Sequence, residues 1–448
     1  MRRRTSQVTR GKRAARGGFT LVEMLVALSA GLLITISVIA LSRDATRTFH
    51  EEMRVSTAEM SLRLAAERLR SDLQRASFMS TPNIWIDRTV VRPQGPTSQF
   101  GTHYPQAIYP GLFNLSGIEL EHEASSTGAV QTYSQTYNGL RPDAIRITGN
   151  MTTADEYVGR VVPGGGCASN GGVGDSVILS ADDPAVMRLM TFGAQNAFMP
   201  ARNASNVLIA TQRFLARVSD PTGKFYNYVP VCNVILTNPP QIQFDFAAPG
   251  SVLTGQMIGT GSGGTSGFAR VVVNPIHTVR WYIRRSASAL LDDPGTDVNA
   301  RFELVRAWVD SRNVEMPVVE VVAEYAIDLK FAFTVEHDKV NHAFTTFEFG
   351  DPLGYAYTPC TDVTGCAKRG GQRFLQPMGL AGPDSIRSVH FRLATRSTFS
   401  DRNTQIAGAP TGYVYRYCLE AASPCKRLVR ARTIVSEVAL PNQKRTMP

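Results

Sequence analysis

The sequence lacks the short patterns that mark most catalytic and zinc-binding centres. Its seven histidines are scattered, and it contains no His-Glu-x-x-His run, no serine framed as a nucleophile elbow and no Cys-x-x-Cys pair. Charged residues are also scarce, at 19% of 448 positions. Nothing in the sequence recommends a Ser/His/Asp cluster, so we do not expect an enzyme.

Apolar residues are not scarce, which excludes disorder for the chain as a whole. They make up 43% of the 448 residues, which is enough to bury one or two cores. Glycine (37 residues) and proline (25 residues) are frequent, and this favours short strands joined by loops over a helical bundle. We therefore expect a mostly β body.

The first 18 residues contain no acidic residue and seven basic ones, so the net charge of +10 falls to +3 for the rest of the chain. A body so close to neutral gives no electrostatic reason to expect nucleic acid as a partner. One cluster of arginines and aromatic residues is compatible with a DNA-binding patch, but its alternation is explained more simply as the exposed face of a strand. The cluster comprises Arg280, Arg284, Arg285, Arg301, Trp281 and Tyr282.

A long apolar run, Phe19–Leu41, follows the basic segment and contains Glu23 as its single charged residue. As a helix at about 1.5 Å per residue it would be about 35 Å long, enough to span a bilayer. The bases before it predict a cytoplasmic N-terminus and a body on the other side of the membrane. A cleaved secretory signal is the alternative, but Ile39–Ser42 is a poor cleavage site. An acid at bilayer depth needs a partner, which makes Glu23 a functional candidate.

The residues Gly17-Gly18-Phe19-Thr20-Leu21-Val22-Glu23, with the basic leader and the apolar run, resemble the type IV prepilin signal. The resemblance implies that a membrane prepilin peptidase cuts after Gly18 and that the new N-terminal Phe19 is methylated. It also implies that Glu23, together with Thr20, Leu21 and Val22, docks into a growing fibre. The new α-amine of a neighbouring subunit would be the partner of the Glu23 carboxylate. A bitopic membrane protein with Glu23 near the interface is the alternative.

Strands later in the chain are similar in order to PilW-type minor pilins and to the related J-type minor pseudopilins of type II secretion. The resemblance implies a single-pass inner-membrane precursor with a periplasmic body, later incorporated into a pilus fibre or its tip. Its implied partners are other minor and major pilins, the prepilin peptidase and the inner-membrane assembly platform. A type II secretion pseudopilin, a DNA-uptake pilin and an enzyme on a pilin-type anchor are the alternatives. The strands that carry this similarity are Val279–Arg285, Leu304–Arg306, Val318–Phe333, Ile386–Arg396 and Ile434–Asn442.

Apolar residues continue at helical spacing beyond the membrane run, and predict one helix from about Phe19 to about Met79, ended by Pro82. Its half at 42–80 is amphipathic, with Asp72 among its polar residues, and is expected to pack on a sheet of the body at 81–448. The predicted fold class is α+β: a long N-terminal transmembrane and amphipathic helix on a large antiparallel β-rich, pilin-like body. The predicted strands are Asp143–Thr148, Ser176–Leu179, Val207–Thr211, Val229–Leu236, Gln241–Phe246, Arg270–Val273, Thr278–Arg284, Phe302–Val309, Val318–Val322, Ile327–Thr334, Phe344–Phe349, Ser388–Thr395, Tyr413–Tyr417 and Ile434–Leu440.

Six cysteines in a translocated body favour disulfides. Their spacing suggests the pairs Cys360/Cys366, Cys418/Cys425 and Cys167/Cys232, although many other connectivities are possible. No metal or other cofactor is expected, apart from calcium as a weak alternative to a solvated turn at Asp292, Asp293 and Asp297. The Gly/Ser-rich segment Gly255–Gly267 either divides the body into two lobes or forms a long hairpin loop.

Overall fold

The computed structural model describes residues 20–84, 87, 89–90, 109–113, 115–121, 140–162, 165–169, 172–173, 175–192, 197–203, 205, 209, 211–219, 223, 226–245, 270–286, 301–338, 340–349, 358–359, 372–373, 382–397, 414–419 and 428–443. The chain forms two compact units, Met1–Ser56 and Thr57–Pro448. Each unit is described by itself.

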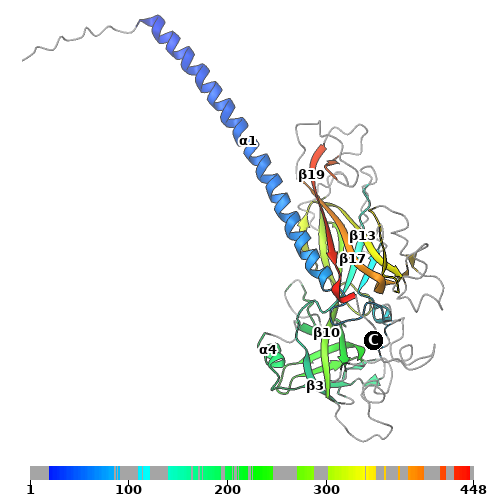
Figure 1. Cartoon of the computed structure of the whole chain (residues 1–448). Helices are drawn as coiled ribbons and strands as arrows, with labels where there is room; N and C mark the ends of the chain where they lie inside the picture. The colour runs from blue at the N-terminus through cyan, green and yellow to red at the C-terminus, as the bar shows by residue number, and fades with distance from the viewer. Residues whose placement is uncertain are drawn as a thin grey trace, which may run out of the picture. The chain divides into compact units, whose positions relative to one another are not determined.

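One helix, α1 (Leu21–Gln74), begins in the first unit and continues into the second (Figure 1). Its first half is apolar, and the large side chains from Leu21 to Leu41 are more than half exposed. By length and composition this helix is able to cross a membrane. The prediction of a single long N-terminal helix is therefore confirmed.

Two antiparallel sheets share the second unit with a third group of strands. We call the first the β1–β12 sheet; its order is β1 (Ile118–Glu121), β2 (Ala144–Gly149), β10 (Arg270–Arg285), β11 (Phe302–Val309) and β12 (Glu320–Glu324). We call the second the β14–β18 sheet; its order is β14 (Ala343–Thr346), β13 (Ala326–Asp338), β17 (Ile386–Arg396), β19 (Leu428–Ala439) and β18 (Arg416–Cys418). Every ladder in both sheets is antiparallel, as predicted.

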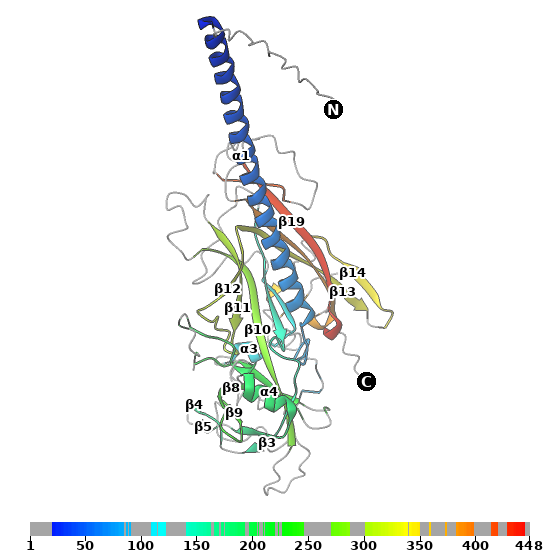
Figure 2. The same ribbon diagram turned by 90° about the vertical axis from the view of Figure 1, so that its left-hand side faces the viewer.

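The part of α1 after Thr57 packs on both sheets (Figure 2). Leu62, Leu69 and Leu73 are at most 1% exposed and share a core with Trp281 of β10 and Phe331 of β13. The predicted sheet cover for this amphipathic half of the helix is therefore present. A helix stripe of this kind has to bury its apolar side chains against another layer, and two sheets provide that layer here.

The helix ends at Gln74, earlier than the predicted Met79. Ser77 has a positive φ of 59°, and its N–H donates to the carbonyl of Thr148 in β2 at 2.8 Å. Gly149 permits this approach, since a Cβ there would lie 2.2 Å from a carbonyl oxygen of the turn. The contact with β2, and not the later proline, therefore ends the helix.

The remaining strands close into a barrel around a second core. Starting from β10, each strand pairs antiparallel with the next, and the last one pairs with β10 again. The barrel interior is apolar, with Val177, Phe244 and Val273 buried. Gly159 lies against this interior, where a Cβ would be 2.5 Å from Val177 Cγ1. After β10, the ring consists of β3 (Tyr157–Val162), β6 (Ser176–Leu179), β9 (Gln241–Phe244), β8 (Tyr226–Ile235) and β7 (Leu215–Ser219).

Several predicted strands need correction. Arg270–Val273 and Thr278–Arg284 form the single strand β10, which crosses Pro275 where only β7 pairs with it among the described strands. A position with one partner strand tolerates a residue without an N–H. Ile209 and Thr211, expected within a strand, lie in irregular and turn structure. The strand predicted at Val318–Val322 is β12, displaced to Glu320–Glu324.

Short elements complete the second unit, and the segment Gly255–Gly267 lies outside the described residues. The helix α4 was not predicted; it follows Asp183, whose carboxylate accepts the N–H of Ala185 at 2.9 Å and so caps the first turn. The short elements are α3 (Pro110–Phe113), α4 (Pro184–Phe192), β4 (Ala168–Ser169), β5 (Gly172–Val173), β15 (Thr358–Pro359), β16 (Gln372–Arg373), η2 (Pro383–Ser385) and η3 (Pro441–Gln443).

Candidate functional site

The start of α1 carries the site residues that the sequence singled out, and two of them bond to each other. The Glu23 carboxylate accepts the backbone N–H and the hydroxyl of Thr20, each at 3.0 Å. In return the Thr20 hydroxyl accepts the N–H of Glu23 at 3.3 Å. This reciprocal arrangement is a capping box, which satisfies two donors at a helix N-terminus. The Thr-x-x-Glu spacing in the sequence is the local signal for this capping box.

Leu21 and Val22 lie in the first turn of α1 and are 77% and 67% exposed. Further along the apolar half, hydroxyl groups bond to the helix itself: Ser29, Thr35 and Ser37 each donate to a carbonyl three or four residues earlier. Because these hydroxyl donors are satisfied within the helix, they need no hydrogen-bond partner in the surroundings, which suits a helix in lipid. Gly17, Gly18 and Phe19, the predicted processing residues, lie outside the described residues.

A buried carboxylate fixes the second half of α1 to the β1–β12 sheet. The Asp72 carboxylate accepts Nε of Arg306 at 2.6 Å and Nε1 of Trp281 at 3.0 Å, and all three side chains are almost fully buried. The sequence placed Asp72 on the polar face of the helix, and this was wrong. A charge so deep is tolerated only because a cation and a second donor meet it.

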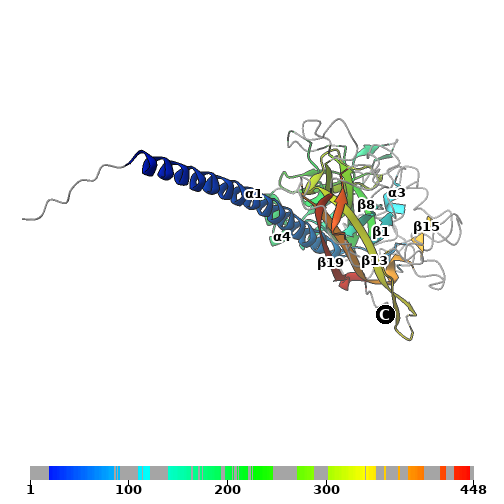
Figure 3. The same cartoon turned by 90° about the horizontal axis from the view of Figure 1, so that it is seen from above.

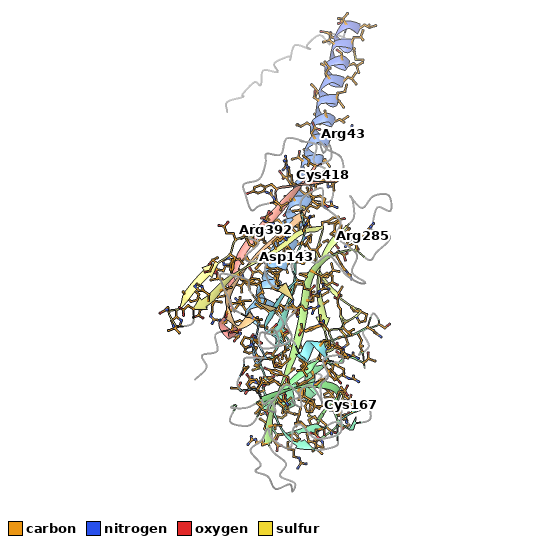
Figure 4. All side chains as sticks on the ribbon, turned by 90° about the vertical axis from the view of Figure 1, so that its right-hand side faces the viewer. Arg43, Asp143, Cys167, Arg285, Arg392 and Cys418 are labelled. Atoms are coloured by element: carbon orange, nitrogen blue, oxygen red, sulfur yellow. A yellow bond between two sulfur atoms is a disulfide. The ribbon has the colours of Figure 1, made fainter. Side chains whose placement is uncertain are left out.

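Two further buried ion pairs lie where β2 meets the β14–β18 sheet (Figure 4). Lys330 Nζ lies 3.0 Å from an Asp143 oxygen, and Arg392 Nε lies 2.6 Å from an Asp328 oxygen. Burial raises the pKa of Asp328, although Arg392 opposes that shift. Lys330 and Arg392 are cross-strand partners on β13 and β17, so the two pairs are neighbours. The first pair links the residue before β2 to β13, and the second links β13 to β17 within one sheet.

Arg280, Arg284 and Arg301 of the suspected DNA-binding patch pair with carboxylates. Arg280 contacts both Glu121 and Glu315, Arg284 lies 3.7 Å from Glu303, and Arg301 contacts Glu303 and Glu324. Trp281 is fully buried and Tyr282 is 3% exposed, so neither aromatic ring is available to stack on a base. The exposed-face interpretation of this strand also needs correction, because Tyr282, on the same face as Arg280, is buried and so is Arg301.

The disulfide predicted between Cys167 and Cys232 is present and joins the β4 region to β8. Figure 4 marks Cys167 beside the barrel strands and Cys418 in the other half of this unit. Cys418 is also disulfide-bonded, and its partner lies outside the described residues. Cys360, Cys366 and Cys425 lie outside them too.

No metal centre emerges from the part of the chain that the structure describes, where no group of three or more His, Cys, Asp or Glu side chains could hold an ion. The calcium candidates Asp292, Asp293 and Asp297 lie outside that part. His277 is fully buried between Phe214 and Trp308, and burial lowers its pKa to about 3, so it stays neutral.

A small polar cavity of about 50 Å³ opens between α3, β2 and the loop after β11. Arg146 crosses it, donating to Asn313 at 2.7 Å and lying 3.4 Å from Glu119 and 2.8 Å from Glu121. Burial raises the pKa of Glu119, and Arg146 opposes the shift. Arg146 therefore pairs with both glutamates beside this cavity.

No protein-family model, curated protein or solved structure matches this chain.

Proposed function

We propose that this chain is a minor pilin: cut after Gly18, held in the inner membrane by Phe19–Leu41, and assembled into a type IV pilus that it primes or caps. The observation that carries the proposal is the run Gly17–Glu23, which leads into the first turn of a helix able to cross a membrane. A chance membrane anchor does not require glycine, a following phenylalanine and an acid at these positions. The function is assembly and not catalysis.

The charge on Glu23 is the chemical basis of the proposed docking step. In a low-dielectric bundle of helices an unpaired carboxylate is costly, so the terminal amine of a neighbouring Phe19 would stabilise it and set the axial register. The capping box with Thr20 holds the carboxylate at the first turn of α1, where such an amine would arrive. Docking would then exchange hydrogen bonds within one subunit for an ion pair between two.

The bulk of the second unit favours a place at the tip of the fibre. The barrel is added to the two sheets that pack on α1, which makes the body large for a subunit repeated in a tight helical lattice. A capping subunit meets neighbours on one side only and can carry such a lobe. At the tip the body would present a surface for adhesion.

Mass spectrometry of the N-terminal peptide, recovered separately from membranes and from sheared surface fibres, tests the proposal. We expect a peptide that begins at N-methylated Phe19 in the fibre fraction. The same peptide found in membranes alone would favour a type II secretion pseudopilin, which acts in a periplasmic fibre. An intact Met1–Gly18 segment in both fractions would overturn the proposal.

Two substitutions at Glu23 separate its charge from its capping role. Glu23→Gln keeps an acceptor for the capping box but removes the charge, whereas Glu23→Val removes both. We expect both variants to be cut and methylated and both to be missing from fibres. Normal incorporation of Glu23→Gln would show that helix capping, and not ion pairing, is what assembly requires.

A further inference from the structure

The β14–β18 sheet has two edges without a neighbouring strand among those described. At one edge β14 pairs with β13 alone. At the other edge β18 covers β19 over 428–430, and hydrogen bonds from 414–415 extend that cover to Thr433. Ile434–Ala439 of β19 therefore has β17 on one side and no described strand on the other.

The β14 edge lacks the protection that soluble proteins usually give such strands. Its four residues, Ala343–Thr346, include no charge and no proline, and Phe344 is 53% exposed. The edge strand β12, in contrast, has Glu320 and Glu324, both in ion pairs. Charged edges prevent pairing with another chain, so β14 is the less protected of the two. The β13–β14 hairpin also extends away from the rest of the unit (Figure 3).

Exposed apolar side chains occur at both edges and on the same face of the sheet. Phe344 pairs across the ladder with Glu336, and Val435, which is 41% exposed, pairs with Arg392. The opposite face carries Val438 and the other side chains that pack on α1. A strand that joined one edge to the other would therefore place Phe344 and Val435 side by side.

The backbone groups at the two edges point outward at these same residues. The N–H of Phe347 donates to β13, so the alternate residue Phe344 directs its N–H and C=O to the free side. On β19 the N–H of Ala431 donates away from β17 and that of Leu440 donates towards it. Val435 therefore also directs its backbone groups to the free side, and the two residues can exchange both hydrogen bonds of one antiparallel pair.

We propose that β14 of one copy adds to the free edge of β19 in a second copy, antiparallel, with Phe344 opposite Val435. β14 runs antiparallel to β13, and β19 runs parallel to β13. A second sheet placed beside the first in the same orientation therefore brings β14 antiparallel to β19, with the same faces of the two sheets aligned. In this register Ala343–Thr345 lie opposite Ile434–Ser436, and His342, just before β14, lies opposite Glu437.

The contact uses a different surface on each copy, so it leaves both end copies with a free edge and does not close into a dimer. It is a property of the second unit and does not depend on the pilin proposal. The experiment below does not measure processing of the N-terminus, so its failure would leave the pilin proposal standing. An unprocessed N-terminus would likewise leave the proposed contact standing.

Cysteine crosslinking of the purified full chain tests the contact. Phe344→Cys in one preparation is mixed with Val435→Cys in another that carries a different tag, and the mixture is oxidised with glutathione disulfide. Within one chain the two positions are three strand spacings apart, about 14 Å, so a bond between them has to join two copies. We expect a mixed dimer from the two single variants. A chain that carries both Phe344→Cys and Val435→Cys should give a series of larger crosslinked species.

Matched variants set the register. Phe344→Cys mixed with Ala439→Cys places the thiols four residues, about 13 Å, out of register and should give no mixed dimer above background. Equal crosslinking of that pair, an abundant Phe344→Cys homodimer, or no product with Val435→Cys would overturn the proposal. In sedimentation, Phe344→Lys should abolish self-association, whereas Val340→Lys, at the 87% exposed tip of the hairpin, should retain it.

Discussion

Glu336 shows how a single carboxylate in the β13–β14 hairpin depends on its neighbours. One oxygen lies 2.7 Å from Nδ1 of His342 and the other accepts Nε of Arg387 at 2.6 Å. Burial raises the pKa of this group, but the hydrogen bonds from His342 and Arg387 outweigh burial and hold the pKa below its usual value. Glu336 therefore stabilises the fold in its charged form.

The sign of this shift predicts a pH dependence. A carboxyl whose folded pKa is depressed contributes stability above its unfolded pKa of about 4.3, and loses it as the pH falls through the folded value. Glu336→Gln should lower the free energy of unfolding by about 1 to 3 kcal/mol at pH 7, with a difference that shrinks as the pH falls below about 4. Urea unfolding from pH 3 to pH 7 measures this.

Glu348→Gln is the matched control, because that side chain is exposed. It should change the free energy of unfolding by less than about 0.5 kcal/mol at either end of the pH range. If the free energies of unfolding of the Glu336→Gln variant and the natural protein differed by the same amount from pH 3 to pH 7, the lowered pKa of Glu336 would be contradicted.

Residue identity alone did not reveal two important roles. Asp72 follows the helical pattern of an exposed acid, and its burial depends on Arg306, which is more than 200 positions away in sequence. Glu23 was singled out for its charge, while its bond to Thr20 is local and follows from the Thr-x-x-Glu spacing. Local roles of this kind can be predicted from sequence, and roles set by a distant partner cannot.

At the scale of elements, the two faces of α1 after Thr57 should respond differently to the same substitution. Leu69 is fully buried in the shared core, whereas Leu64 is 61% exposed. Leu69→Ala should lower the free energy of unfolding by about 2 to 5 kcal/mol, because it removes a buried side chain and leaves a cavity. Leu64→Ala should change it by less than about 0.5 kcal/mol.

Denaturant unfolding of both variants in the same detergent measures this contrast. Equal losses would mean that the helix face has been assigned wrongly, and equal small effects would mean that the second half of α1 does not depend on the sheets. The substitutions have the same helix propensity and differ only in their surroundings.

Strands with a clear alternation could be located from the sequence, and their partners could not. Phe302–Val309 and Ser176–Leu179 were predicted with the observed bounds, because β-branched and apolar residues there are framed by turn residues. Pro275 suggested a break in β10, but the strand continues because its neighbours change at that point. The rule against proline in strands assumes two partners, and the number of partners is a tertiary fact.

At the scale of the whole molecule, the barrel is the part that sequence reasoning could not supply. Closure requires β7 to return to β10 across more than 50 positions, and no local signal encodes that pairing. The sequence did predict a large antiparallel β-rich body, and the pairing of Cys167 with Cys232. The barrel and the helix-covered core share β10, so β10 couples the two cores mechanically.

Removal of the barrel disulfide tests this coupling. The bond closes a loop with a sequence separation of 65 residues, so Cys167→Ala with Cys232→Ala should lower the free energy of unfolding by about 4 kcal/mol. Because β10 runs through both cores, the fluorescence of Trp281, which lies in the other core, should lose its native signal at the same lowered denaturant concentration as the overall circular dichroism, measured in a chain whose other two tryptophans are replaced by phenylalanine. If the Trp281 signal instead kept the midpoint of the natural protein while part of the β signal was lost earlier, the barrel would unfold by itself and β10 would be divisible near Pro275.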